Sequence, residues 1–297
     1  MPVEDHPKPN SPAAADGPCA SPGLPEGHYY SPTVDPTEAS VQRAMDAEAH
    51  PTASLASFGI DEQEVLRWYE IIAKHYDRTP FPEQPAPGRR YYYANPNFPL
   101  ADALALLGFM AEKRPRRYIE VGAGFSSCAA IDVNEQYLDG QVQMTFLDPC
   151  PETVFELLGD GSPYRDRVMS LRLQDAPLEW FTELAAGDIL FIDSSHVAKT
   201  GSDVLDCFFR ILPQLRSGVL VHLHDIFFPF EYPREWIVQE RRYWNEAYFL
   251  RAFLQGNASF RVLYFSDWMY KCRRDLFASR TPLCVTHRGG SCWMQRV

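Results

Sequence analysis

Histidine and aspartate residues gather at the ends of two apolar stretches in the second half of the sequence. The stretch DILFID ends in Asp193 and continues through two serines to His196, and the stretch GVLVHLHD ends in His224 and Asp225. Carboxylates and imidazoles together can hold a divalent cation or steer a proton transfer. If the two stretches are neighbouring strands about 4.8 Å apart, Asp193 and Asp225 converge on one point.

These residues also have structural interpretations. A histidine inside a buried strand is usually a satisfied core residue, and His222 has that position in HLHD. His224 and Asp225 stand where the strand emerges from the sheet, and ligands of open α/β sheets bind at that edge. We therefore expect His222 to be structural and the other two to be functional.

A second group of candidate residues lies in EVGAGFSS. Gly122 and Gly124 permit a tight turn and a close approach of the backbone to a ligand, and Glu120 comes two residues before the first glycine. The dinucleotide-binding fingerprint GxGxxG requires a glycine at position 127, where this chain has Ser127. A plain strand-to-helix turn would also explain the glycines, so both interpretations stay open.

Two further carboxylates follow the next two predicted strands. Asp148 ends QMTFLD, where a carboxylate can accept the ribose hydroxyls of a nucleoside or cap the following helix. Asp175 lies in QDAPLEW, where it can face an adenine amino group or cap a short helix.

From Arg116 onward, short apolar stretches alternate with helical ones. This alternation predicts a parallel sheet with helices on both faces. The predicted strands are YIEVG, QMTFLD, VMSLRL, DILFID, GVLVHLHD, FRVLYFS and GSCWMQR. The predicted helices begin at Ser126 and Glu152 and span residues 178–184, 203–215 and 234–255.

The chain divides into three predicted regions. Residues 1–55 are rich in Pro, Ala, Ser and Asp, and they predict a disordered tail. Residues 56–115 predict a helical cap region that packs on the core, with helices in DEQEVLRWYEIIAKHY and PLADALALLGFMAEK. Residues 116–297 form the predicted core.

Composition narrows the class of partner. The net charge of −11 disfavours nucleic acid and anionic membranes, and no stretch approaches the roughly 20 apolar residues of a membrane span. The N-terminus lacks the features of a secretory signal, and the seven scattered cysteines form no CxxC pair. We expect a cytoplasmic protein with free thiols and a small-molecule substrate, and the possibility of a homo-oligomer stays open.

Four segments in order, YIEVGAGFSS, FLDP, GDILFIDSSHVAKTGSDV and GVLVHLHDIFFPFEYPREW, resemble class I S-adenosylmethionine (SAM) dependent methyltransferases. More narrowly, they resemble a bacterial branch known as a methyltransferase domain. The resemblance covers residues 91–297. It implies a Rossmann-like, seven-stranded, mostly parallel sheet, with GSCWMQR as the last, antiparallel strand and helices on both faces.

The resemblance also implies roles for individual residues. Glu120 and the glycine-rich loop would hold the methionine part of SAM, Asp148 the ribose, and Asp175 would lie near the adenine. The usual third glycine of the loop is Ser126 here, which places a hydroxyl near the SAM carboxylate. The implied cofactor-binding residues are Glu120, Gly122, Gly124, Ser126, Ser127, Asp148, Asp175 and Asp193.

The ends of the fourth and fifth strands resemble those of metal-assisted O-methyltransferases, in which acids hold magnesium against a substrate hydroxyl. Asp193 and Asp225 match those places, and His196 lies where such enzymes can carry a basic residue. His224 has no clear counterpart in these enzymes. We expect Asp193, Asp225 and His224 to hold Mg²⁺ or another divalent cation, if a metal is used.

The sequence therefore predicts methyl transfer from SAM to a small-molecule acceptor, with a hydroxyl favoured and a place in secondary metabolism. His196 or His224 would remove the proton, beside Asp225. Tyr93, Phe228 and Tyr232, from two aromatic segments, would line the acceptor pocket.

Two alternatives stay open at this point. Two histidines and an acid could hold iron for an oxygenase or hydroxylase on the same fold, although the spacing in HLHD does not match the facial triad of such enzymes. The chain could also be a non-catalytic SAM-binding scaffold, but the joint presence of Glu120, Asp148, Asp193 and Asp225 disfavours a decayed site.

Overall fold

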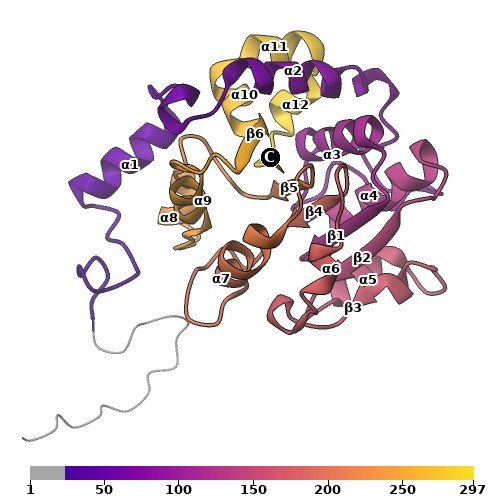
Figure 1. Ribbon diagram of the computed structural model, residues 1–297. Helices are drawn as coiled ribbons and strands as arrows, with labels where there is room; N and C mark the ends of the chain where they lie inside the picture. Colours follow the sequence, from indigo (N-terminus) through magenta and orange to yellow (C-terminus); the bar gives the residue numbers. More distant parts are fainter. Residues whose placement is uncertain (1–23) are drawn as a thin grey trace, which may run out of the picture.

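The computed structural model describes residues 24–297, which form a seven-stranded sheet with the strand order β3-β2-β1-β4-β5-β7-β6 (Figure 1). Strands β1 to β5 pair in parallel, and β7 runs antiparallel to both β5 and β6. The expected Rossmann-like sheet with an antiparallel last strand is confirmed. The strands are β1 (Arg117–Val121), β2 (Gln143–Leu147), β3 (Val168–Met169), β4 (Ile189–Ile192), β5 (Leu220–Leu223), β6 (Phe260–Phe265) and β7 (Cys292–Arg296).

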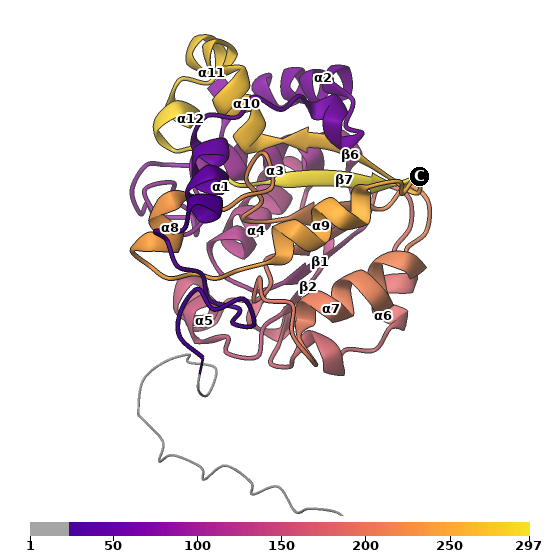
Figure 2. The ribbon, with the colours of Figure 1, turned by 90° about the vertical axis from the view of Figure 1, so that its left-hand side faces the viewer.

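The central strands are buried on both faces, since every residue of β4 and β5 is buried. This burial explains why these strands are continuous apolar stretches rather than alternating ones. Figure 2 shows α7 and α9 in front of the sheet and α3 and α4 behind it. The helices around the core are α3 (Leu100–Lys113), α4 (Phe125–Tyr137), α5 (Glu152–Leu158), α6 (Glu179–Thr182), α7 (Asp203–Asp206), α8 (Arg234–Val238), α9 (Glu246–Leu254), α10 (Ser266–Cys272), α11 (Arg274–Arg280) and α12 (Leu283–Thr286).

Helix α3 is apolar on nearly all sides because it packs on the sheet between helix α4 and helix α2 (Glu62–Ala73), which itself contacts β6. Trp68 of α2 stacks on Phe109 of α3 at a centroid distance of 4.0 Å, and Phe109 stacks on Trp293 of β7 at 4.1 Å. Asp61 caps α2 by accepting a hydrogen bond from the backbone of Gln63. The N-terminal helices thus contact the sheet, while the predicted domain boundaries stay predictions.

Part of the predicted tail is helical. Helix α1 (Ala39–Ala49) lies within residues 1–55, and its Met45 and Glu48 are buried. The amino-acid composition gave no sign of this helix, because α1 packs on segments far away in the sequence, including α8. The rest of the predicted tail up to residue 23 lies outside the described residues.

Three elements differ from the predictions. The expected helix over 234–255 is interrupted between α8 and α9, because the backbone N–H groups of Asn245 and Glu246 donate to the carbonyl of His196 instead of continuing a helix. Strand β3 has two residues rather than the whole of VMSLRL. The expected helix over 203–215 begins as α7 and continues as one π turn and one 3₁₀ turn.

Two expectations about the chain as a whole can be compared with residues 24–297. No helix in this range is long and apolar enough to cross a membrane. The six cysteines in the same range are all free thiols.

Candidate functional site

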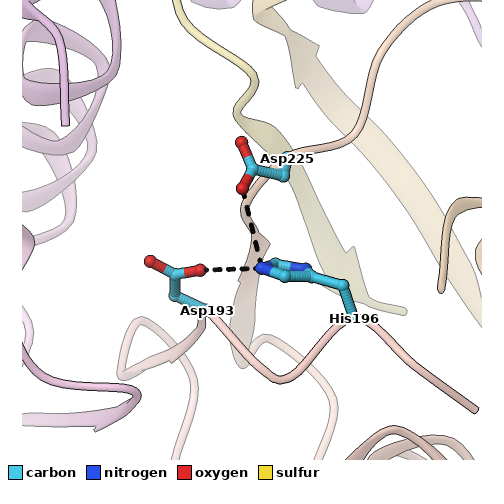
Figure 3. A group of neighbouring side chains, drawn as sticks. All are labelled: Asp193, His196 and Asp225. Carbon is cyan, nitrogen blue, oxygen red and sulfur yellow. Dashed lines mark ion pairs between the residues drawn. The ribbon is translucent and has the colours of Figure 1, made fainter. Parts of the chain in front are cut away.

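A cluster of charged side chains lies at the carboxyl edge of the sheet, where β4 and β5 end side by side. Ile192 of β4 pairs with Leu223 of β5, so Asp193 and Asp225 emerge next to each other. His196 Nε2 lies 3.2 Å from Asp193 Oδ1 and 3.6 Å from Asp225 Oδ2. Figure 3 shows the imidazole between the two carboxylates. The predicted convergence of the two strand ends is therefore found in the structure.

His196 is held from several sides. Its backbone has a positive φ of 59°, and its N–H donates to Ser194 Oγ. Its Nδ1 lies 2.8 Å from Oε2 of Glu246, a carboxylate that is only 1% exposed. The ring of Trp244 stacks on the imidazole at 4.1 Å. The carboxylate of Glu246 binds the proton on Nδ1, and Nε2 therefore faces Asp193 and Asp225.

The surrounding carboxylates change the protonation of the cluster. Burial alone would lower the pKa of His196, but the hydrogen bonds to Asp193 and Glu246 raise its pKa to about 10. Burial would raise the pKa of Asp193, but the charges of His224 and His196 lower it below its ordinary value. The neighbouring carboxylates therefore favour the charged, imidazolium form of His196.

His224 is held by a second buried carboxylate. Its Nε2 lies 3.1 Å from Oδ2 of Asp102 in α3, which is fully buried and also accepts the backbone N–H groups of Gly290 and Ser291. Its Nδ1 lies 3.4 Å from Asp225 Oδ1 and 3.7 Å from Asp193 Oδ1. This nitrogen makes no hydrogen bond within the described residues. Burial opposes the charged form, yet the nearby Asp225 and Asp193 raise the pKa of His224 well above its usual range.

The glycine-rich loop passes directly beside this cluster. Gly122 has a φ of +81°, and a Cβ there would lie 1.9 Å from the backbone oxygen of Asp193. Only glycine fits such a position. A Cβ on Gly124 would meet open space. Asp148 accepts the backbone N–H groups of Ala123 at 2.9 Å and Cys150 at 2.7 Å, so its carboxylate also fixes the loop.

Glu120 lies behind the loop rather than facing a cavity. Its fully buried carboxylate accepts hydroxyl hydrogen bonds from Tyr118, Ser126 and Ser127 at 2.6–2.9 Å. Burial raises the pKa of Glu120 to about 8, although the three hydroxyls favour its charged form. The interaction ties the end of β1 to the first turn of α4.

Two cavities lie at the carboxyl edge, and both are lined by Gly122, Asp148 and Asp193. The first measures about 250 Å³ and is also lined by Asn97, Gly124 and Ser126, among others. The second measures about 390 Å³ and is also lined by Leu173, Gln174 and Lys199, among others. The charged cluster therefore borders both cavities through Asp193.

Several predicted residues lie elsewhere. Asp175 pairs with Arg172 at 2.9 Å and has a half-exposed side chain, while its neighbours Leu173 and Gln174 line the second cavity. Of the predicted acceptor residues, Phe228 and Tyr232 are buried in the core and Tyr93 packs on His287. These three line neither of the two cavities. As expected, His222 is a core residue, which stacks on Phe191 and contacts Ser291.

Sequence reasoning missed the two carboxylates that hold the histidines. Asp102 is the only acid among the first eleven residues of the apolar helix α3, and an isolated acid in such a helix is a usable signal. Glu246 begins α9, where an acid is common, so its position alone gave no sign of its role.

Comparisons with known proteins agree with this geometry. A family model described as a methyltransferase domain matches residues 119–226, which span β1 to the end of the charged cluster. An uncharacterised protein of Archaeoglobus fulgidus is 31% identical over 165 residues, which make up 54% of this chain and 73% of the archaeal protein.

Solved structures give more distant likenesses. The SAH-bound methyltransferase PaMTH1 of Podospora anserina is 15% identical, with 89% of this chain and 99% of that chain covered and a TM-score of 0.42. The O-methyltransferase TomG of Streptomyces achromogenes, in complex with SAM, is 13% identical, with 86% and 98% covered and a TM-score of 0.42.

Proposed function

Because the chain belongs to the class I SAM-dependent methyltransferases, we propose that it transfers the methyl group of SAM to a hydroxyl of a small molecule. One observation carries this proposal. Asp193 lines both cavities at the sheet edge and also belongs to the cluster with His196 and Asp225. A bound cofactor and a proton-accepting group would thus meet at one residue.

The two cavities suggest how SAM lies. In this proposal the methionine part occupies the cavity lined by Gly124 and Ser126, and the adenosine part occupies the cavity lined by Leu173 and Gln174. Asp148, between them, faces the ribose. Glu120 and Ser127 act from behind the loop, and Asp175 contributes only if its pair with Arg172 opens.

The protein's part in the reaction is alignment and proton removal. Methyl transfer from a sulfonium is an in-line substitution, so the acceptor oxygen must face the methyl group in a site that excludes water. His196 is the proposed base because Glu246 keeps the proton on Nδ1 and leaves Nε2 to take the hydroxyl proton. His196 must be neutral for this, so a positive charge beside Asp193 and Asp225 would favour the reactive form.

We propose that Asp193, Asp225 and His224 would hold a divalent cation at this place. His224 Nδ1 lies 3.4 Å from Asp225 Oδ1 and 3.7 Å from Asp193 Oδ1. Adjacent ligands of a metal with bonds of about 2.1 Å lie roughly 3–3.5 Å apart, so small shifts of the Asp193 side chain would complete such a set. The buried Nδ1, which has no hydrogen-bond partner among the described residues, would serve as a ligand after losing its proton, and Asp102 holds the other ring nitrogen. A bound cation would lower the pKa of the acceptor hydroxyl.

The imidazole of His224 as a proposed ligand bears on which metal would bind. Mg²⁺ prefers oxygen ligands, whereas Mn²⁺, Fe²⁺ and Zn²⁺ also accept imidazole nitrogen. We therefore propose Mn²⁺ or a similar transition metal ahead of Mg²⁺.

The remaining parts of the proposal concern the cell. The net charge of −11 favours a small acceptor over nucleic acid, and secondary metabolism is the proposed setting. The scattered, odd number of cysteines supports a reducing, cytoplasmic location.

Calorimetric titration of the metal-stripped protein with SAM, alone and with Mn²⁺ or Mg²⁺, tests the cofactor and the metal. We expect micromolar SAM binding, followed by methyl transfer in a screen of hydroxyl acceptors. Asp193→Ala and Asp225→Ala should abolish transfer while the protein stays folded. Absence of SAM binding under every condition would overturn the proposal, and unchanged turnover in both variants would remove these carboxylates from the mechanism.

A metal-dependent oxygenase on the same fold is the second candidate. The observation in its favour is that two imidazoles and two carboxylates face one point, although His196 and His224 come from different loops. Oxygen consumption by the Fe²⁺-loaded protein without bound SAM would favour this candidate.

A further inference from the structure

The N-terminal arm, residues 24–58, packs against the segment that follows β5, residues 226–245, which we call the wall segment. Arg234 of the wall segment donates to Gln42 of α1 at 2.9 Å. The ring of Phe58 lies 5.7 Å from that of Phe228 and 5.2 Å from that of Phe230. Figure 1 shows α1 beside α8, far from the core helices α3 and α4. The arm therefore contacts the chain immediately after Asp225.

The tightest contact between the arm and the wall segment passes through a buried lysine. Lys271 of α10 places its ammonium group 2.6 Å from Glu48 of α1, 2.7 Å from Asp267 and 2.8 Å from the carbonyl oxygen of Phe228. An ammonium group has three protons, and here each has an acceptor. The side chains of Lys271, Glu48 and Asp267 are 7%, 9% and 2% exposed. We call these three residues the lysine clamp.

The clamp holds both polar groups of one peptide residue. Asp267 Oδ2 accepts the N–H of Phe228 at 2.8 Å, and Lys271 donates to the carbonyl of the same residue. Phe228 comes three residues after Asp225. With both its N–H and its carbonyl bound to α10, the backbone at Phe228 has a fixed position and direction.

Asp225 depends on such support. It has a φ of +56°, in the left-handed region that non-glycine residues adopt at a cost. Such a conformation persists when the surrounding structure fixes it. On one side His224 N–H donates to Ile192, and on the other Ile226 N–H donates to Gly290. The lysine clamp is the next tether along the wall segment.

We propose that Lys271, together with Glu48 and Asp267, is a positioning residue that holds Asp225 in the charged cluster, and that the N-terminal arm is therefore part of the acceptor side of the site. This inference rests on the proposed function for its catalytic meaning. The contacts of the arm described above reach the wall segment and α10, so we expect its role to be separate from cofactor binding.

The deciding variant is Glu48→Ala, because alanine preserves helix α1 while removing one of the three acceptors. We expect amide hydrogen exchange of residues 226–230 to rise about tenfold through local opening. The affinity for Mn²⁺, measured by electron paramagnetic resonance, should fall about tenfold, as it does when a supporting residue of a metal site is lost. SAM binding measured by calorimetry should change by less than about twofold.

Three further variants complete the experiment. Glu48→Gln keeps an acceptor oxygen and should restore most of the wild-type exchange. Lys271→Met should have the same effects as Glu48→Ala and larger ones, and if it does not fold, Glu48→Ala decides. Glu64→Ala is the matched control, because Glu64 pairs with Arg67 on α2, away from the wall segment.

Wild-type exchange at residues 226–230 in Glu48→Ala would overturn the inference, as would a loss of SAM affinity equal to the loss of Mn²⁺ affinity. Failure of the proposed function looks different, because the wild-type protein itself would then bind no SAM. Hydrogen exchange needs neither cofactor nor acceptor, so it tests the clamp in that case too.

Discussion

The two halves of the sheet edge are built in different ways. On the cofactor side, the chain from Glu120 to Ser127 forms its own hydrogen bonds, and Asp148 of the adjacent strand end completes the loop. On the acceptor side, each histidine is held by a distant carboxylate. His196 pairs with Glu246, 50 residues away, and His224 pairs with Asp102, 122 residues away.

The two sides are therefore sensitive to different changes: the cofactor side to backbone geometry and the acceptor side to the balance of charges. The loop passes so close to Asp193 that only glycine fits at position 122, so steric contact restricts which residue can stand there. The cluster places four carboxylates around two imidazoles, so electrostatic interactions determine which of these side chains are charged. Changes to the glycines of the loop should act through folding and fit, and changes to the charged cluster should act through protonation.

Gly122→Ala should have the largest effect. The added Cβ would lie 1.9 Å from the oxygen of Asp193, at a φ that alanine disfavours. We expect a loss of about 4 kcal/mol or more in the free energy of unfolding, measured by urea denaturation. Gly124→Ala is the matched control, because its Cβ has open space in the protein. The control should keep its stability within about 1 kcal/mol and weaken SAM binding, and equal stability losses in both variants would contradict the steric argument.

Glu120→Gln tests a carboxyl group on the cofactor side whose pKa burial raises strongly. The pKa of Glu120 is about 8 in the folded protein, against an ordinary 4.5, so the folded state binds the proton more tightly than the unfolded state. The stability from this group is present below its ordinary pKa and is lost as the pH rises toward 8.

The free energy of unfolding of the wild type should therefore fall relative to that of Glu120→Gln, by on the order of 3 kcal/mol between about pH 5 and pH 8.5. Urea denaturation of both proteins over this pH range measures the difference. Parallel pH profiles of the two proteins would show that Glu120 is not protonated in the fold.

Glu246→Gln should have the smallest effect on stability and a specific effect on the reaction. The substitution removes a negative charge that raises the pKa of His196, and the amide can donate to Nδ1, which leaves Nε2 protonated. We expect methyl transfer to fall about 100-fold. SAM binding should be unchanged, and Glu183→Gln at the exposed pair with Arg117 serves as the control. If SAM affinity and the rate of methyl transfer fall equally, Glu246 supports the fold and has no specific role in proton transfer.

The predictions from sequence succeeded where one local pattern sufficed. The alternation of apolar and helical stretches gave the sheet, because a strand buried on both faces has little choice of residue. The convergence of Asp193 and Asp225 followed from adjacent parallel strands. The aromatic residues Phe228 and Tyr232 were predicted to line a pocket and are buried instead, because composition does not tell a pocket wall from a core.

What the sequence by itself determined is the architecture and the identity of the edge residues, since both depend on short-range periodicity and on the direction of parallel strands. Only the tertiary structure decided which way each imidazole faces. Glu246 and Asp102 set those orientations from α9 and α3, and the lysine clamp joins α1 to the wall segment. Contacts between residues so far apart leave no period in the sequence, because they depend on how whole helices pack against the sheet.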